Sequence, residues 1–191
     1  MLVSAEPAAH EREPAVAAAA AAAERDCPTV DRVSGELPLA IAGVELRRLS
    51  VHADPRGVLT PVLDVRDPFW DEPIVYAYRF SILPGRIKGW GMHELQSDRY
   101  FVVSGDVRVV LFDGREDSGS SGSIVEINFT DRTPGLVKIP PGVWHADQNW
   151  GETEAHVVNF PTRPYDPDHP DKYRIDPHSG TIPFDWSIRD R

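Results

Sequence analysis

Apolar and polar residues alternate in short runs from about residue 36 to about residue 160, and this pattern predicts β-strands. The runs are rich in β-branched and aromatic residues and end at Gly, Pro, Asp or Ser. They read GVELRRLSV, GVLTPVLDV, PIVYAYRFSIL, RYFVV, VRVVLF, SIVEINF, GLVKI and EAHVVNF. Ser104-Gly105-Asp106 between two of them is typical of a tight hairpin. Because no long segment has helical periodicity, these short strands predict an all-β, double-sheet jelly-roll barrel.

The composition changes at both ends of this β-rich region. Residues 1–30 contain an alanine tract between charged residues, EPAVAAAAAAAERDCP. Because this segment has little apolar surface to bury, we expect a disordered N-terminal tail. Residues 31–191 are expected to form one domain. After Pro161 the chain becomes rich in Pro and Asp, which predicts an irregular C-terminal arm lying across the barrel.

Charge and cysteine content narrow the possible partners. The chain has 20 Lys and Arg against 30 Asp and Glu, a net charge of −10, which argues against nucleic acid because phosphate binding needs a basic surface. No run approaches the roughly 18 apolar residues of a membrane helix, so no membrane association is expected. Cys27 is the single cysteine, so no internal disulfide can form and a reducing cytoplasm is the expected location.

The most specific pattern is IPPGVWHADQN, residues 139–149. It resembles the second motif of the cupin superfamily through Pro140, Gly142, His145 and Asn149. A tight turn at Pro-Pro-Gly would direct the following strand so that His145 points into the barrel. The alternative is an ordinary turn before a strand that carries a hydrogen-bonded core histidine.

WGMHELQSDRYFVVSG, residues 90–105, resembles the first cupin motif with Gly91 in place of its first histidine. His93 takes the second histidine position and Asp98 takes the carboxylate position. Together with His145 they make a two-histidine, one-carboxylate set that suits Fe(II) or a similar ion. The alternative is that Asp98 pairs with a nearby arginine and that the histidines bind no metal.

A longer resemblance runs through most of the predicted domain. DPRG (54–57), DGREDSGSSG (113–122), IPPGVWH and the tail YDP…IDPHSGTIPFDW match, in order, segments of the dTDP-4-dehydrorhamnose 3,5-epimerase family. Members of that family are metal-free jelly-roll cupins, usually homodimers, that invert sugar carbons next to a 4-keto group of a nucleotide sugar. The resemblance therefore implies a cupin barrel, no cofactor, and an isomerase acting on a nucleotide-linked 4-keto-6-deoxy sugar.

Proton removal next to a ketone needs a base, a group that stabilises the enolate, and an acid. The resemblance makes His93 the base and Asp176 the carboxylate that holds its imidazole; the alternative for Asp176 is a simple Asp-Pro turn. The family's lysine falls on or near Asp98, so Arg99 beside it is the candidate for stabilising the enolate. The family's tyrosine falls on Asn159, which cannot act as an acid.

The candidate substrate-binding residues are cations suited to a diphosphate and polar or aromatic groups near the two histidines. They are Arg56, Lys88, Trp90, Gln96, Arg115, His145 and Asn159. Single Arg and Lys residues are also common as solvated surface charges, and a Trp in a barrel is commonly core. Lys88 could replace Arg99 at the enolate, and Tyr76 or Tyr100 could return the proton.

Three classes of function follow from these observations. The leading hypothesis is an epimerase of a nucleotide-linked 4-keto-6-deoxy sugar. The second is a metal-dependent cupin enzyme that uses His93, Asp98 and His145. The third is a barrel that has lost its catalytic acid and only binds or cyclises a ligand. The expected partners are a nucleotide-linked sugar or related small molecule and a second copy of the chain in a homodimer.

Overall fold

The computed structural model describes residues 39–188, and the regular structure in this range is nearly all β. The strands are β1 (Glu45–Arg48), β2 (His52–Asp54), β3 (Gly57–Leu59), β4 (Tyr78–Ile82), β5 (Ile87–Met92), β6 (Asp98–Ser104), β7 (Val107–Asp113), β8 (Ile124–Phe129), β9 (Gly135–Ile139), β10 (Val143–Asn149), β11 (Ala155–Asn159) and β12 (Tyr173–Arg174). One turn of 3-10 helix, η1 (Pro68–Trp70), precedes β4. The described residues contain no helix with the length and apolar character of a membrane crossing. The tail predicted for residues 1–30 lies outside the described residues.

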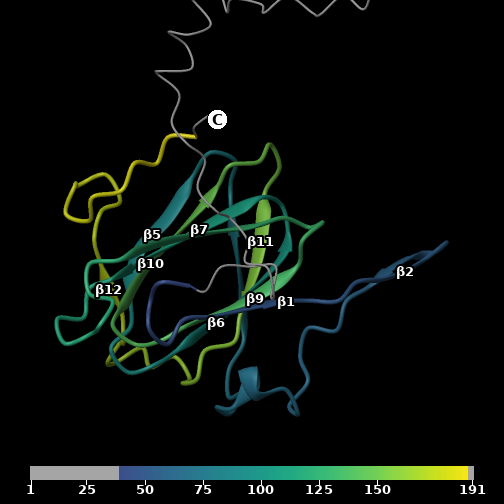
Figure 1. Ribbon diagram of the computed structural model, residues 1–191, viewed down its shortest axis with the longest axis horizontal. Coiled ribbons are helices and arrows are strands. Elements are labelled where there is room, and N and C mark those ends of the chain that lie inside the picture. Colours follow the sequence, from purple (N-terminus) through teal and green to yellow (C-terminus); the bar gives the residue numbers. More distant parts are fainter. Residues whose placement is uncertain (1–38, 189–191) are drawn as a thin grey trace, which may run out of the picture. The chain divides into compact units, whose positions relative to one another are not determined.

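Two five-stranded antiparallel sheets face each other and enclose an apolar core (Figure 1). One has the order β1-β9-β6-β11-β4 and the other β12-β5-β10-β7-β8. The core between them includes Val109 and Leu111 of β7 and Val137 of β9, all of which are fully buried. This arrangement confirms the all-β, double-sheet jelly roll predicted from the alternation of apolar and polar residues.

Alternation along β10 places chemically different residues on its two faces. Successive side chains of a strand point to opposite sides of the sheet, so His145 and Asp147 face the interior while Trp144 and Ala146 face outward into a second apolar cluster. In the pairing with β5, His145 lies opposite Gly91, and Asp147 opposite Lys88, with a shift of register between the two pairs. The interior face of these two strands therefore forms the floor of the site.

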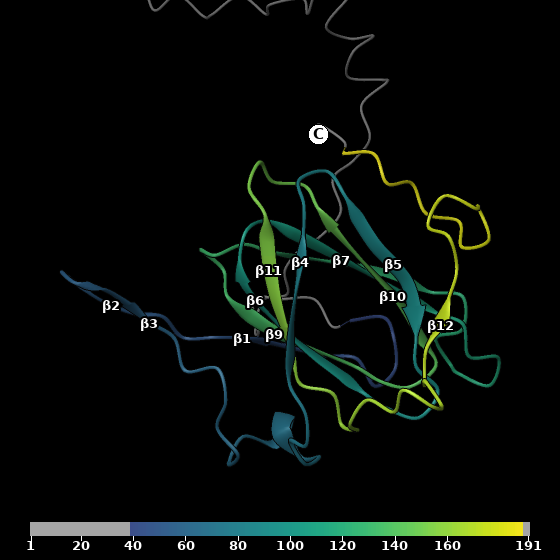
Figure 2. The same cartoon turned by 180° about the vertical axis from the view of Figure 1, so that it is seen from behind.

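The C-terminal arm is irregular, as predicted, and it covers the outer face of this sheet. Its two-residue strand β12 pairs with the end of β5, where Tyr173 lies opposite Met92. The chain then runs along the outside of the sheet (Figure 2), and Ile182, Phe184 and Trp186 pack over the outward residues of β5 and β10. The arm is thus held by a short strand and by an apolar cluster of its own.

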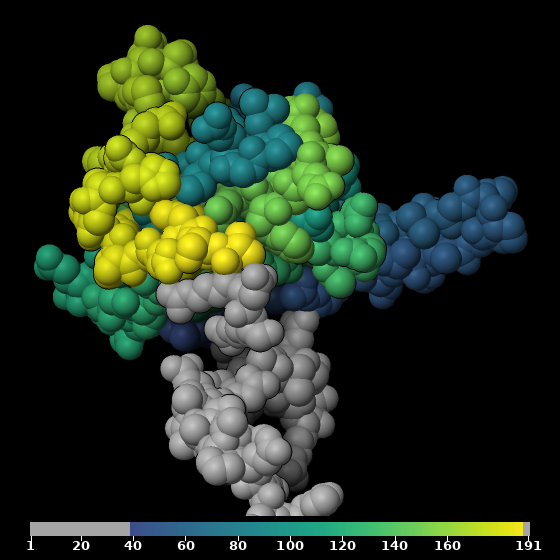
Figure 3. All heavy atoms as spheres, turned by 90° about the horizontal axis from the view of Figure 1, so that it is seen from above, coloured from purple at the N-terminus to yellow at the C-terminus, as the bar shows by residue number. Residues whose placement is uncertain are grey.

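The outer face of the other sheet is covered by the segment that leads to β4. Phe69 and Trp70 of η1 are buried there against Leu136 of β9. Two of the predicted strand runs, GVLTPVLDV and PIVYAYRFSIL, are shorter than expected, and Pro61 and Pro73 within them cannot donate to a ladder. Strands β2 and β3 form a separate hairpin that projects from the barrel. The C-terminal arm, in contrast, lies against the barrel (Figure 3).

The predicted hairpin at residues 104–106 connects β6 to β7, and it generates a test of the fold. Gly105 and Gly122 have φ angles of +88° and +79°, a region that disfavours a Cβ by about 1–2 kcal/mol. A Cβ at Gly105 would also lie 2.7 Å from Ala155 Cα, whereas a Cβ at Gly122 meets nothing within 4 Å. We expect Gly105→Ala to lower the free energy of unfolding by about 2–4 kcal/mol and Gly122→Ala by only about 1 kcal/mol. Urea denaturation measures both, and equal losses would contradict the close packing of this hairpin on β11.

Candidate active site

A cavity of about 980 Å³ opens between the interior of the barrel and the arm. Its volume is at the upper end of the range for small-molecule pockets, roughly 300–1,000 Å³. The titratable side chains that line it are Tyr76, Tyr78, Lys88, His93, Tyr100, His145, Asp147, Arg163, Tyr165, Asp166, His169, Asp171, Lys172 and Arg174. The two histidines singled out in the sequence therefore meet in one cavity, together with residues of the arm.

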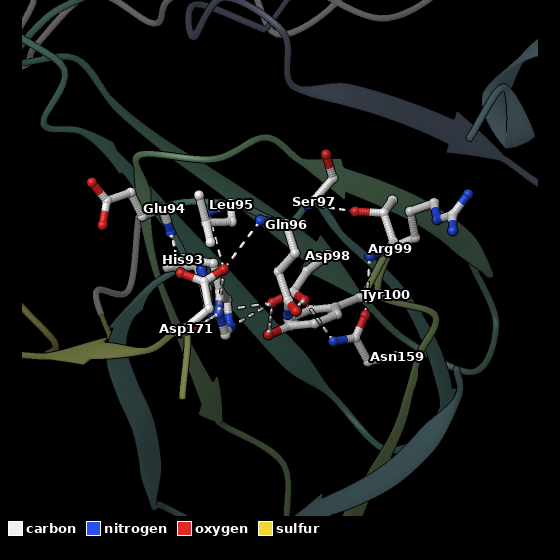
Figure 4. Close-up of polar contacts among 12 residues, drawn as sticks. His93, Glu94, Leu95, Gln96, Ser97, Asp98, Arg99, Tyr100, Asn159 and Asp171 are labelled. Carbon is white, nitrogen blue, oxygen red and sulfur yellow. Dashed lines mark hydrogen bonds and ion pairs between the residues drawn. The ribbon is translucent and has the colours of Figure 1, made fainter. Parts of the chain in front are cut away.

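His93 follows β5, and the arm fixes the orientation of its ring (Figure 4). Its Nδ1 contacts the backbone carbonyl oxygen of Asp171, and Asp171 Oδ2 lies 3.9 Å from the same nitrogen. Because a carbonyl oxygen can only accept, we assign the ring proton to Nδ1, and Nε2 of the neutral ring is then the basic atom. Nε2 is buried and has no hydrogen-bond partner among the described residues. His93 Nε2 thus faces the carboxylate of Asp98, 3.5 Å away, without a hydrogen bond.

The arm carboxylate on the Nδ1 side of His93 is that of Asp171, which corrects the prediction of Asp176. Asp171 accepts hydrogen bonds from the three backbone N–H groups of residues 94–96, at 2.8, 3.0 and 3.1 Å. Asp176 instead accepts a 2.9 Å hydrogen bond from the backbone N–H of His178 in an exposed Asp-Pro turn. The physical reason is the strand β12, which separates the two aspartates and carries the chain away from the cavity.

Asp98 lies between the two imidazoles and is 1% exposed. Its Oδ2 is 3.5 Å from His93 Nε2 and 3.6 Å from His145 Nε2. Its Oδ1 accepts hydrogen bonds from Gln96 Nε2 at 3.0 Å and from Asn159 Nδ2 at 2.8 Å (Figure 4). Asn159, predicted to bind substrate, therefore positions this carboxylate, and Gln96 does so while also lining the cavity.

The same three residues, His93, Asp98 and His145, could hold a divalent cation. One ligand atom from each lies within 4.8 Å of the others, and atoms that bind one ion at about 2.0–2.2 Å are typically about 3–4 Å apart. Neither Nε2 has a hydrogen-bond partner among the described residues, so a bound ion would satisfy both. The structure thus brings together the predicted metal set as well as the predicted base.

Arg99 points away from the cavity (Figure 4). It is fully buried, and its guanidinium donates to the carbonyl oxygens of Phe160, Glu72 and Pro73 at 2.8, 2.9 and 3.0 Å. It also lies 5.0 Å over the ring of Trp70. Because neighbouring residues of a strand face opposite sides, a residue next to Asp98 cannot reach the same cavity. The predicted role of Arg99 at the enolate is therefore wrong; it fastens the segment that covers the outer face of the sheet.

Three predicted binding residues also lie outside the cavity or turn away from it. Arg56 sits in the projecting hairpin with its side chain 90% exposed and forms a 2.6 Å ion pair with Asp54. Arg115 forms a 2.8 Å ion pair with Asp113 and braces the loop that follows β7. Trp90 borders the cavity, but it is 1% exposed and belongs to the apolar cluster under the arm.

Sequence reasoning missed several titratable groups of the cavity, above all Asp147. This residue is 3% exposed, its Oδ1 has no hydrogen-bond partner among the described residues, and burial raises its pKa to about 7. Burial also lowers the pKa of His145 to about 4 and raises that of Tyr78 to about 12, so both are neutral at pH 7. One signal for Asp147 was present, because it lies two residues after His145 in a strand and must share its face.

Asp147→Asn should change how stability depends on pH. In the unfolded chain Asp147 loses its proton near its ordinary pKa of 3.8, whereas in the folded protein it keeps the proton to about pH 7. Between about pH 3.8 and pH 7 the folded state therefore binds more protons than the unfolded state. The contribution of Asp147 to stability is fully present below about pH 3.8 and is lost as the pH rises to about 7. Asn cannot ionise, so the variant should gain up to a few kcal/mol on the wild type between these limits.

Urea denaturation at about pH 4.5 and about pH 7.5 measures the effect. The control is Asp117→Asn, on an exposed loop, which should show the same pH dependence as the wild type. A constant difference between Asp147→Asn and the wild type at both pH values would contradict the raised pKa.

Comparison with known proteins identifies relatives of this chain. Residues 52–173 match the family described as the polysaccharide biosynthesis C-terminal domain. The chain is 37% identical over 155 residues to the spore coat polysaccharide biosynthesis protein SpsL of Bacillus subtilis, with 79% of this chain and 99% of that protein covered. It is 32% identical over 151 residues to a protein of Haloferax volcanii named as a probable low-salt glycan biosynthesis epimerase, Agl13, with coverage of 77% and 95%.

A solved structure shares both the fold and part of the sequence. The dTDP sugar isomerase of Desulfovibrio desulfuricans G20 superimposes with a TM-score of 0.74 at 29% identity, covering 81% of this chain and 97% of that one. A solved dTDP-4-dehydrorhamnose 3,5-epimerase of Sulfolobus tokodaii, 24% identical to this chain, has the same fold with a TM-score of 0.65, as the resemblance in the sequence implies for the fold. The chain therefore belongs to the polysaccharide biosynthesis C-terminal domain family, and it resembles a solved dTDP sugar isomerase in fold and in part of its sequence.

Proposed function

We propose that this protein epimerises a nucleotide-linked 4-keto-6-deoxy sugar by removing the proton next to the ketone. The observation that carries the proposal is the geometry of His93, whose Nδ1 is held by Asp171 and whose Nε2 is buried and unpartnered beside the cavity. The relatives support it, since a dTDP sugar isomerase and a glycan biosynthesis epimerase are among them and a 4-keto-6-deoxy sugar epimerase shares the fold.

The charges around the cavity suit a nucleoside diphosphate. Although the whole chain carries a net charge of −10, Lys88, Arg163 and Arg174 all line this cavity and are exposed at it. Arginine can bind phosphate oxygens through two parallel hydrogen bonds. In this proposal the exposed cations hold the diphosphate, and the sugar reaches the buried histidines.

The proton transfers can be assigned to residues of this chain. His93 Nε2 takes the proton from the carbon next to the ketone, and the electron pair of the C–H bond moves onto the ketone oxygen to give an enolate. Tyr78 is the acid that we propose for the return step. Its hydroxyl accepts a 3.0 Å hydrogen bond from Asn159 Nδ2, so its own proton is free, and a pKa of about 12 keeps that proton in place at pH 7. Asn159, which stands where the family has a tyrosine, would thus position a different tyrosine.

His93→Asn should nearly abolish solvent deuterium exchange into the sugar, because loss of a general base typically costs about 10²–10⁴-fold. Binding of the nucleoside diphosphate should be retained, since His93 does not contact it in this proposal. Asp171→Asn should lose less, because the Asp171 carbonyl oxygen that fixes Nδ1 is still present. Mass spectrometry of the sugar in D₂O gives the rates, and calorimetry gives the affinity.

Asp176→Asn is the matched control, since it makes the same chemical change five residues further along the arm and should leave exchange unaltered. If His93→Asn exchanged deuterium at the wild-type rate, the base would lie elsewhere. If the wild type bound the nucleotide sugar without any exchange, the chain would be a ligand-binding barrel. The homodimer and the cytoplasmic location expected from the sequence stay predictions.

A metal-dependent enzyme is the second candidate, because His93 Nε2 and His145 Nε2 face the same carboxylate oxygen of Asp98 without other partners. A bound divalent ion would act as a Lewis acid toward a ketone or similar oxygen.

Metal analysis of protein purified without chelator tests this candidate. It predicts about one ion per chain, which His145→Ala should remove and which His169→Ala, an exposed histidine of the same cavity, should not. Full activity in chelator-treated, metal-free protein would exclude it.

A further inference from the structure

We propose that Lys172 of the C-terminal arm is the cation that stabilises the enolate oxygen. This inference rests on the proposed function and deepens it. The chemistry requires such a group, and the residue expected from the sequence, Arg99, faces the opposite side of β6 with its guanidinium bound to three carbonyl oxygens. The role therefore falls to one of the cations that line the cavity.

Lys172 lies deeper in the cavity than the other cations. Lys88, Arg163 and Arg174 are exposed, whereas Lys172 is only partly exposed. A Cβ built on Gly91 would lie 3.3 Å from Lys172 Nζ and 3.2 Å from His145 Nε2. The ammonium and the imidazole thus border the same small space on the floor of the barrel, and this space exists because residue 91 has no side chain.

The ammonium of Lys172 is available to an anion. It has no hydrogen bond and no close ion pair with another described residue, although the carboxyl groups of Asp98 and Asp147 act on it electrostatically. Burial lowers its pKa, because a desolvated cation is less stable than a hydrated one. Negative charge that develops on an enolate oxygen would compensate this loss of hydration, and such compensation favours the transition state over the neutral ketone.

The arm holds Lys172 in place from both sides. On one side, the carboxylate of Asp171 is bound by the backbone N–H groups of residues 94–96. On the other side, Tyr173 pairs with Met92 of β5, and its hydroxyl donates a 2.8 Å hydrogen bond to Glu94. These contacts fix the backbone from which the Lys172 side chain extends into the cavity, so the main chain need not rearrange to bring the ammonium to the developing charge.

Lys172→Met, with Arg132→Met as the control that removes a cation outside the cavity, tests the inference. Three quantities are measured for each: kcat and KM for deuterium exchange into a nucleotide-linked 4-keto-6-deoxy sugar, and the Kd of the nucleoside diphosphate, which has no ketone. Loss of a group that acts on the enolate should lower kcat by about 10²–10³-fold and leave the Kd within about twofold. Arg132 lies on an exposed loop and does not line the cavity, so Arg132→Met should leave kcat, KM and the Kd unchanged.

Lys172→Arg separates loss of charge from loss of packing. It keeps the cation, so it should recover at least about tenfold of the exchange that Lys172→Met loses, and thermal unfolding shows whether both variants keep the native fold. Two results would overturn the inference: wild-type kcat in Lys172→Met, or a weaker Kd with kcat unchanged, which would make Lys172 a phosphate ligand. If instead the wild type binds the nucleotide but exchanges no deuterium, the proposed function itself fails and the role of Lys172 fails with it.

Discussion

The geometry of the cavity around His93 depends on the attachment of the Asp171 carboxylate to the turn at residues 94–96. Asp171 binds the three consecutive backbone N–H groups of residues 94–96, and this contact joins the irregular arm to the turn between β5 and β6. A carboxylate that accepts several N–H groups makes charge-assisted hydrogen bonds, which are stronger than neutral ones. Through this attachment the arm fixes the imidazole of His93 and the backbone that carries Lys172. This attachment also holds the backbone carbonyl oxygen of Asp171 against His93 Nδ1.

A second constraint is the burial of polar groups around Asp98. A buried carboxylate is stable only when hydrogen bonds or cations replace its lost hydration. Gln96 and Asn159 supply two such bonds to Oδ1, and the hydroxyl of Tyr100 lies 3.3 Å from Oδ2. Gln96 and Asn159, which the sequence predicts as substrate-binding residues, therefore serve to hydrogen-bond the buried carboxylate of Asp98 in place of water.

The sequence predicted the barrel and its two histidines because both follow from local rules. Alternation of apolar and polar residues marks strands with one buried face, and a Pro-Gly turn fixes where β10 begins. It could not predict which aspartate of the arm meets His93. Asp166, Asp168, Asp171 and Asp176 all lie in a segment rich in Pro and Asp, and only the pairing of β12 with β5 selects one of them.

The prediction that Arg99 stabilises the enolate is wrong for a related reason: contacts in the fold, and not proximity in the sequence, decide which residues meet. Arg99 is next to a site residue in the sequence, but adjacency in a strand means opposite faces, and the outer face is covered by η1 and the residues around it. Lys172 carried no comparable signal, since it lies about 80 residues from His93 in the chain and reaches it only through the fold. A spacing of two residues within a strand, as for His145 and Asp147, predicts a shared face better than direct adjacency does.

Strand β10 has a consequence for how this protein can change during evolution. Its odd-numbered residues 145 and 147 face the cavity, and its even-numbered residues 144 and 146 hold the arm. A one-residue insertion or deletion would exchange these faces, placing Trp144 in the cavity and a histidine under the arm. The length of this strand is therefore fixed by the fold, whereas the exposed residues 163–170 can lengthen or shorten. New substrate preferences are accordingly open to this chain through the loops of the arm while the barrel stays fixed.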